Sequence, residues 1–260
     1  MTTKHFLNLR DLSKQDILSI LDRAIERKNQ KQKEKTLVGS KLGLIFEKPS
    51  TRTRISFESG ILNLGGNAIF MSSSDLQLSR GEPVSDTAKV ASSMLDVIAL
   101  RVDKHETLDM FAANSSVPVI NALSDLSHPC QILADLMTFK ENSANELEKV
   151  CWIGDGNNVC NSYIEASKML DFELSIYCPK EYSPNPSFLN YAKDNSSFAN
   201  SREEAAKGAD IITTDVWVSM GDEKTKERAF EGYFVDTDLI ENTGKKSIFL
   251  HCLPAHRGQE

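Results

Sequence analysis

The chain has 260 residues, of which 40% are apolar and 26% are charged, and its formal net charge is −7. This length accommodates one large or two ordinary domains, and the composition excludes disordered, collagen-like and coiled-coil proteins. The acidic balance argues against broad binding to nucleic acid or to an anionic membrane, although it is compatible with a local basic site for an anion.

Cysteine content and the N-terminal residues indicate the compartment. The five cysteines form no CxxC pair and no zinc-type spacing, which is typical of reduced thiols. The first twenty residues lack the apolar stretch of a signal peptide, and no window approaches the roughly 18 apolar residues of a membrane span. We therefore expect a cytoplasmic protein that binds no membrane and no nucleic acid.

The first predicted element is an amphipathic helix that begins after Ser13. Ser13 and Asp16 have the spacing of a capping box, in which each side chain accepts a hydrogen bond from the other residue's backbone. Apolar side chains then recur at helical spacing, at Ile17, Leu21, Ala24 and Ile25. The charged run at 28–35 is predicted to be a solvated helix end or loop.

Two series of alternating strands and helices follow. The first has strand-like runs at 42–46, 68–71, 97–102 and 117–121, with helical patterns at 54–64, 84–94 and 129–140. The second has strands at 150–153, 174–177, 209–213 and 247–250 and a helix at 159–170. This alternation predicts an α/β fold of two domains, residues 1–140 and 141–260, each a parallel sheet flanked by helices. We expect the active site in the interdomain cleft, at the carboxyl ends of the strands.

Residues 46–58, FEKPSTRTRISFE, predict an anion site. They lead from a strand into a helix, and they bring together three hydroxyl groups, two guanidinium groups and the N–H groups of a helix start. A tetrahedral dianion such as phosphate binds to this combination of groups. The alternative is an ordinary Ser/Thr helix cap with surface arginines, but the two arginines that flank Thr53 favour the anion site.

The segment 126–136, LSHPCQILADL, places His128 at the entry of a helix and Gln131 one turn further on. An imidazole and a carboxamide that face the same space would polarise a carbonyl group and hold an amide-like NH2 group. The motif is weak by itself, because a histidine before proline is more often an ordinary loop residue.

Three further polar segments follow predicted strands. In WIGDGNNVCNS (152–162) a valine replaces the third glycine of a dinucleotide fingerprint, which argues against a nucleotide oxidoreductase. Asn157 and Asn158 would instead present amide donors to a carboxylate. In the segment 213–223, Asp215 offers a carboxylate to an ammonium group, and in 249–259 Cys252 is a thiol at a strand end. A zwitterionic amino acid would need this pairing of a carboxylate with carboxylate-binding donors.

Six segments in order, FEKPSTRTR, DLQLSRGEP, HPCQ, GDGNN, DVWVSMG and HCLPAHRG, resemble the signature segments of ornithine carbamoyltransferases. The resemblance covers nearly the whole chain. It implies transfer of the carbamoyl group of carbamoyl phosphate to the δ-amino group of L-ornithine, giving L-citrulline and phosphate in arginine biosynthesis. It also implies two α/β domains, a homotrimer with active sites shared between subunits, and neither a metal nor an organic cofactor.

The same resemblance implies roles for individual residues. Those expected to bind carbamoyl phosphate are Ser50, Thr51, Arg52, Thr53, Arg101, His128 and Gln131, with Gln77 reaching the phosphate from a neighbouring subunit. Those expected to bind ornithine or to line the point where the substrates meet are Asn158, Asp215, Ser219, Met220, Cys252 and Leu253. Arg101, His128 and Cys252 are the expected catalytic residues. Arg54 is expected to hold its loop through a carboxylate such as Glu47 or Glu58.

The chain departs from the family pattern at its end. The second domain of the family continues past HCLPAHRG for some tens of residues, so we expect this sequence to be truncated there. Two alternatives stay open at this point. One is a carbamoyltransferase for another amine, such as putrescine, an N-acylated ornithine or aspartate, and the other is a catalytically silent binding homologue.

Overall fold

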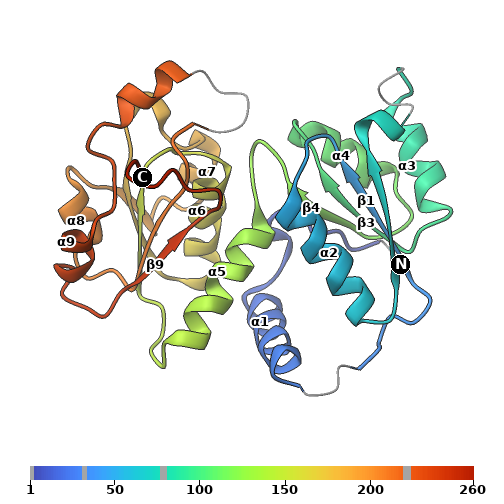
Figure 1. Cartoon of the computed structure of the whole chain (residues 1–260), viewed down its shortest axis with the longest axis horizontal. Helices are drawn as coiled ribbons and strands as arrows, with labels where there is room; N and C mark the ends of the chain where they lie inside the picture. The colour runs from blue at the N-terminus through green and yellow to red at the C-terminus, as the bar shows by residue number, and fades with distance from the viewer. Residues whose placement is uncertain (1–2, 31–33, 77–80, 219–223) are drawn as a thin grey trace. The chain divides into compact units, whose positions relative to one another are not determined.

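The computed structural model describes residues 3–30, 34–76, 81–218 and 224–260. It divides into two compact units, Met1–Cys130 and Gln131–Glu260 (Figure 1). Each unit contains one sheet in which every neighbouring pair of strands is parallel, with helices packed on it. The predicted fold class is thereby confirmed. The division falls inside helix α5 (Pro129–Asn142), whereas the sequence placed the boundary after residue 140.

The N-terminal helix α1 (Lys14–Asn29) begins where the sequence predicts. Ser13 Oγ accepts a hydrogen bond from the Asp16 backbone N–H, and Asp16 Oδ2 accepts one from the Ser13 backbone N–H, both at 3.1 Å. This reciprocal pair confirms the capping box. Ile17 and Leu21 are buried and Ala24 and Ile25 are half-buried, so the predicted apolar stripe is the less exposed face of α1.

The sheet of the first unit has the strand order β2-β1-β3-β4. Its strands are β1 (Lys41–Phe46), β2 (Asn67–Ser72), β3 (Val97–Arg101) and β4 (Val119–Leu123), and its helices are α2 (Thr51–Asn63), α3 (Val84–Ser92) and α4 (His105–Asn114). Alternate side chains of β1 enter different cores, because Leu44 packs with Ile61 of α2 and Ile45 packs with residues of α3 and α4. This period of two is the mark of a sheet covered by helices on both faces.

The sheet of the second unit has the order β7-β6-β5-β8-β9. Its strands are β5 (Lys149–Ile153), β6 (Glu173–Tyr177), β7 (Ser196–Phe198), β8 (Ile211–Thr214) and β9 (Ile248–His251). Its helices after α5 are α6 (Asn158–Leu170), α7 (Pro186–Tyr191), α8 (Arg202–Ala206) and α9 (Thr237–Glu241). Short 3-10 helices complete the described chain: η1 (Leu9–Asp11), η2 (Ser73–Asp75), η4 (Lys180–Tyr182) and η5 (Lys224–Phe230). No helix in the described ranges is long and apolar enough to cross a membrane.

Each sheet has one topological switch point, where strands that are successive in the chain stop being added on one side of the first strand and are added on its other side. In the first sheet this point lies between β1 and β3, and in the second it lies between β5 and β8. At such a point, the loops that follow the two neighbouring strands lead to opposite faces of the sheet. A crevice therefore forms between these loops at the carboxyl ends of the strands. The segments 47–50 and 102–104 therefore frame one candidate site, and the segments 154–157 and 215–217 frame another.

Candidate functional site

The first candidate site lies at the start of helix α2. The helix begins at Thr51 rather than at residue 54, and Ser50 is its N-cap, with Ser50 Oγ accepting a hydrogen bond from the Thr53 backbone N–H at 3.4 Å. Thr51, Arg52 and Thr53 therefore occupy the first helical turn, where backbone N–H groups and the helix dipole favour an anion. Backbone N–H groups at a helix start of this kind are able to bind a phosphate.

Arg101, the last residue of β3, extends this site from the neighbouring strand. Its Nη1 lies 3.5 Å from Thr53 Oγ1, and its buried Nε has no hydrogen-bond partner among the described residues. Burial lowers the pKa of Arg101, and the positive charge of Arg52 lowers it further. The guanidinium groups of Arg52 and Arg101 repel one another, and a bound dianion would remove this repulsion.

Arg54 is held away from this cluster. Its Nε donates to Glu58 Oε1 at 2.8 Å, and its guanidinium lies 3.6 Å from the centre of the Phe70 ring. The expected contact with a nearby carboxylate is therefore confirmed for Glu58. Glu47 instead connects the segments after β1 and β3, because its Oε2 accepts a hydrogen bond from the Asp103 backbone N–H at 2.6 Å.

His128 is a neutral imidazole in this structure. Burial, and secondarily the positive charge of Arg101, lowers its pKa to about 3. The loop before it is fixed by buried hydrogen bonds, in which Asn121 Nδ2 donates to Ser127 Oγ at 3.0 Å and Ser127 Oγ donates to Asn8 Oδ1 at 3.2 Å. A neutral imidazole polarises a carbonyl oxygen by hydrogen bonding without adding a charge next to Arg101.

In the second unit, Asn157 joins the segments that follow β5 and β8. Its Oδ1 accepts hydrogen bonds from the backbone N–H groups of Val159 and Cys160, so Asn157 is the N-cap of α6. Its Nδ2 donates to Asp215 Oδ2 at 2.9 Å. Asn157 was expected to present an amide donor to a carboxylate, and in the described residues that carboxylate is Asp215. Its role is to orient Asp215.

Asp215 is the carboxylate at the reversal point of the second sheet. Burial raises its pKa to about 6, although hydrogen bonds from the Val216 backbone N–H and from Asn157 lower it. A carboxyl group of this kind is ionised at neutral pH and is stabilised by a ligand cation, because its negative charge is only partly solvated.

Cys252 and Leu253 follow β9, and the Cys252 backbone N–H donates to the Thr214 carbonyl oxygen at 3.4 Å. Burial and the nearby negative charges of Asp215 and Asp135 raise the pKa of Cys252 well above its ordinary value. The thiol is therefore protonated at physiological pH and is a poor proton acceptor. Leu253 is exposed.

Two polar contacts of the second unit were missed from the sequence. Asp135 Oδ1 accepts a hydrogen bond from Gln131 Nε2 at 2.9 Å, and Lys226 Nζ pairs with Asp155 Oδ2 at 2.6 Å. The spacing of Gln131 and Asp135, four residues apart in a predicted helix, was the available signal for the first contact. Three expected site residues, Gln77, Ser219 and Met220, lie outside the described residues.

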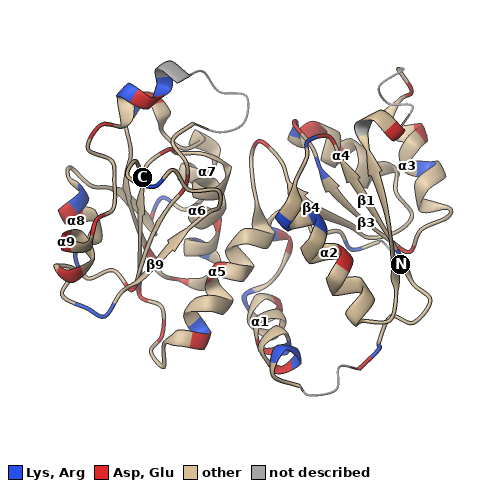
Figure 2. Cartoon of the chain, in the orientation of Figure 1, with Lys and Arg blue, Asp and Glu red and all other residues tan. Residues whose placement is uncertain are grey.

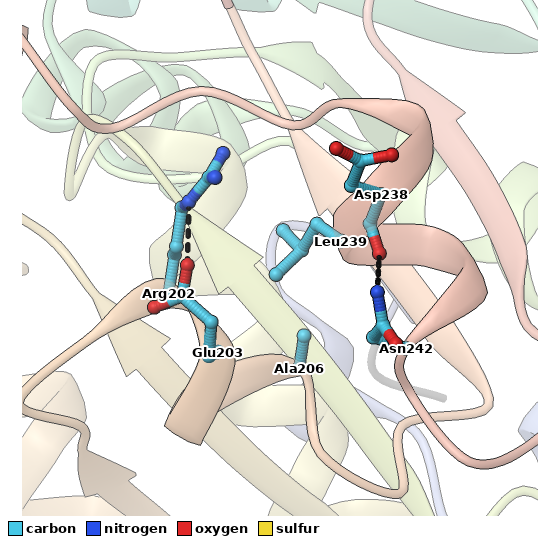
Figure 3. A pocket seen from close by; sticks show the side chains of 6 residues that line it. All are labelled: Arg202, Glu203, Ala206, Asp238, Leu239 and Asn242. Carbon is cyan, nitrogen blue, oxygen red and sulfur yellow. Dashed lines mark hydrogen bonds and ion pairs between the residues drawn. The ribbon is translucent and has the colours of Figure 1, made fainter.

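A separate pocket is lined by residues of α8 and α9, together with Asn242 (Figure 3). Arg202 at its rim pairs with Glu203 at 2.8 Å and with Asp236 at 2.9 Å. The two carboxylates neutralise the positive charge of Arg202, and the pocket uses none of the strand-end motifs. Helix α8 contains one basic residue, Arg202, and α9 contains none, so no broad basic face is present there (Figure 2). We therefore do not include this pocket in the candidate site.

Gly156, in the second candidate site, lies at a position with no room for a side chain. Its backbone N–H donates to the Tyr182 carbonyl oxygen at 2.9 Å, and a Cβ atom at Gly156 would collide with the backbone of Tyr182 and Pro184. We expect Gly156→Ala to displace the turn that orients Asn157, with a lower melting temperature and weaker amino-acid binding. Gly208→Ala is the comparison for stability, because its Cβ would meet no atom within 4 Å although its φ of +72° favours glycine. A larger loss of melting temperature in Gly208→Ala would contradict the steric argument.

Together, the fold and the two strand-end sites define a two-domain α/β protein with a candidate anion site on the first sheet and a carboxylate-containing candidate site on the second. A family model described as "Aspartate/ornithine carbamoyltransferase, carbamoyl-P binding domain" matches residues 4–141, and one described as "Aspartate/ornithine carbamoyltransferase, Asp/Orn binding domain" matches residues 147–260. The chain belongs to the aspartate/ornithine carbamoyltransferase family, which confirms the resemblance.

Individual relatives support this assignment. The chain is 51% identical to an ornithine carbamoyltransferase of Acinetobacter baylyi, over 100% of this chain and 87% of that protein. Among solved structures, it is similar to the anabolic ornithine carbamoyltransferase of Campylobacter jejuni, with a TM-score of 0.93 and 47% identity over 99% of this chain and 88% of the other. The ornithine carbamoyltransferase of Pyrococcus furiosus also matches with a TM-score of 0.93, at 39% identity over 99% of this chain and 87% of that one.

Proposed function

We propose that this chain transfers the carbamoyl group of carbamoyl phosphate to the δ-amino group of L-ornithine, releasing L-citrulline and phosphate. The observation that carries the proposal is the cluster of Arg52, Thr53 and Arg101 at a helix start, next to the neutral imidazole of His128. This set of groups suits a phosphorylated carbonyl compound. The ornithine carbamoyltransferase names of relatives about 50% identical to the chain support the choice of ornithine.

In this reaction the neutral amine attacks the carbamoyl carbon, and negative charge develops on the carbonyl oxygen. Arg101, His128 and Thr53 are proposed to stabilise that oxygen, where one well-placed donor contributes about 3 to 4 kcal/mol. Arg52, with Ser50 and Thr51 at the helix start, holds the phosphate that leaves. Holding both substrates in place supplies a further part of the rate enhancement.

On the amino-acid side, Asp215 is proposed to bind an ammonium group of ornithine. Asn158, Ser219 and Met220 complete the proposed binding set, and Cys252 and Leu253 line the reacting groups. The raised pKa of Cys252 favours Asp215 over Cys252 for any proton-accepting role in the second unit. No metal or organic cofactor takes part in the proposed reaction.

The test is a citrulline-formation assay with purified protein, carbamoyl phosphate and L-ornithine. Putrescine, an N-acylated ornithine and L-aspartate are the competing substrates. A half-buried carboxylate, Asp215, in the amine site favours a cationic substrate over aspartate, whose second carboxylate it would repel. Faster carbamoylation of any competitor would reassign the substrate. Binding of carbamoyl phosphate without any product would identify a silent homologue.

We further propose a cytoplasmic homotrimer of arginine biosynthesis in which active sites are shared between subunits. The exposed apolar side chains of the first unit support self-association, because Ile55 and Leu62 of α2 are each 59% exposed, and Ile69 on the edge strand β2 is 45% exposed. Apolar residues gathered on a helix and on an unpaired sheet edge favour burial against another copy.

Mixing two inactive variants tests the shared site. If Gln77 acts across a subunit boundary, a trimer formed from Gln77→Ala and Arg52→Ala chains contains some sites that carry neither substitution. Activity should therefore recover in part after the subunits exchange, and charge-tagged electrophoresis verifies that exchange. If mixed trimers form and activity stays at the level of the parents, both residues serve the site of one chain.

A further inference from the structure

Asp135 lies at the centre of a buried hydrogen-bond network that the proposed reaction does not yet use. It lies on helix α5, one turn after Gln131, and only 7% of its surface is exposed. Asp135 Oδ1 accepts a hydrogen bond from Gln131 Nε2 at 2.9 Å, and its Oδ2 accepts one from the Tyr163 hydroxyl at 2.8 Å. Each carboxylate oxygen therefore has its own donor.

Tyr163 gives this network a rigid support. It is fully buried on helix α6, and its ring lies against Trp152 of β5 with the ring centres 5.9 Å apart. A phenol held in one position by packing fixes the carboxylate that it contacts. Asp135 is thus oriented from α6, while it orients a side chain of its own helix.

The charge of Asp135 decides which end of the Gln131 amide faces it. Burial raises the pKa of Asp135 to about 6, with hydrogen bonds from Tyr163 and Gln131 opposing the shift and the negative charge of Asp215 adding to it. At neutral pH the group is therefore a carboxylate, which only accepts hydrogen bonds. The amide nitrogen of Gln131 must point toward Asp135, and its carbonyl oxygen Oε1 must point the other way.

We propose that Asp135 is a positioning residue that determines substrate selection, because it turns Gln131 so that Oε1 is offered to the NH2 group of the carbamoyl donor. This inference rests on the proposed function and adds a specific discrimination to it. Acetyl phosphate has the same phosphate and carbonyl groups as carbamoyl phosphate but carries a methyl group in place of NH2. An acceptor oxygen distinguishes these two molecules, whereas an amide NH2 group in the same place would not favour the carbamoyl compound.

The decisive variant is Asp135→Asn. Tyr163 would donate to the new Oδ1, so the new Nδ2 would face Gln131 and force its amide to turn over. The NH2 group of Gln131 would then meet the NH2 group of carbamoyl phosphate, donor against donor. We expect the preference for carbamoyl over acetyl phosphate, measured as the ratio of dissociation constants by calorimetry, to fall by about 10-fold or more.

Tyr163→Phe is the matched control, because it removes the other hydrogen bond to Asp135 and leaves the Gln131 contact in place. It should keep the preference. Asp135→Ala is the second variant if Asp135→Asn does not fold, and it should also lose the preference because Gln131 is no longer oriented.

Four results would overturn the proposal. In Asp135→Asn, an equal loss of affinity for both compounds would indicate a structural role only, and unchanged affinities for both would exclude any role of Asp135 in binding. Equal affinities of the unmodified protein for the two compounds would show that the NH2 group is not recognised, while leaving carbamoyl transfer intact. If the unmodified protein binds neither compound and forms no citrulline, the proposed function itself fails and this inference fails with it.

Discussion

Replacement of Arg52 by alanine should lower kcat/KM for carbamoyl phosphate by about 10- to 150-fold at saturating ornithine, because a charge-assisted contact to a bound phosphate contributes about 1.5 to 3 kcal/mol. The lowered pKa of Arg101 supports this expectation. Arg52 lies close enough to Arg101 to lower the Arg101 pKa, so both positive charges would contact the same bound phosphate. Removal of one of them leaves a dianion only partly neutralised.

Arg54→Lys is the control for this experiment. Arg54 is two residues away in the same helical turn, but its guanidinium is bound to Glu58 and stacked on Phe70. The lysine keeps the positive charge and loses the stacking geometry, so we expect a small change in stability and kinetics that differ little from the unmodified protein. Unchanged kinetics in Arg52→Ala, or an equal loss in Arg54→Lys, would refute the assignment of Arg52 to the phosphate.

The predictable parts of this structure are those set by residues close together in the chain. The capping box of Ser13 and Asp16 and the contact of Arg54 with Glu58 each depend on a spacing of three or four residues. The long apolar runs also predict most of the strands correctly to within one or two residues. Helices α7, α8 and α9 have six, five and five residues, which is too short to show a helical period.

The unpredicted parts of the candidate site depend on contacts between distant segments. Asp135 acquires its position from Tyr163, which is 28 residues away on another helix. The sequence predicts that Asn157 presents an amide donor to a carboxylate, but it does not show that Asp215, 58 residues away, lies within hydrogen-bond distance of that amide. The protonation of His128 and Cys252 depends on burial, which is a property of the folded chain.

Asp215→Asn should lower activity with ornithine while it changes the melting temperature little. Loss of the carboxylate removes a charge-assisted contact with the ornithine ammonium group, so we expect kcat/KM for ornithine to fall by about 10- to 150-fold. Affinity for carbamoyl phosphate should stay unchanged, because its proposed ligands in the first unit are intact. An asparagine variant that keeps full activity with ornithine would remove Asp215 from the binding site.

The effect of pH on unfolding gives a second readout of the same variant. Burial raises the pKa of Asp215 from 3.8 to about 6, so the folded chain binds this proton more tightly than the unfolded chain does. The free energy of unfolding therefore decreases as the pH rises from about 4 to about 6, and a cost on the order of 3 kcal/mol is present at neutral pH. Asp215→Asn removes that cost, but its own NH2 group then faces one of the two donors that Asp215 accepts from, Asn157 Nδ2 or the Val216 backbone N–H.

These two effects oppose each other at neutral pH. We expect the melting temperature of Asp215→Asn at pH 7.5 to stay within a few degrees of the unmodified protein, and its dependence on pH between 4 and 6 to become weaker. Asp210→Asn is the structural control, because Asp210 Oδ2 accepts hydrogen bonds from the Glu148 and Lys149 backbone N–H groups at 2.9 Å each. It should lower the melting temperature at pH 7.5 and leave the kinetics with ornithine unchanged. If Asp215→Asn instead unfolds at much lower temperature and keeps the original pH dependence, the Asp215 carboxylate after β8 is structural, and the cation of the substrate must bind elsewhere.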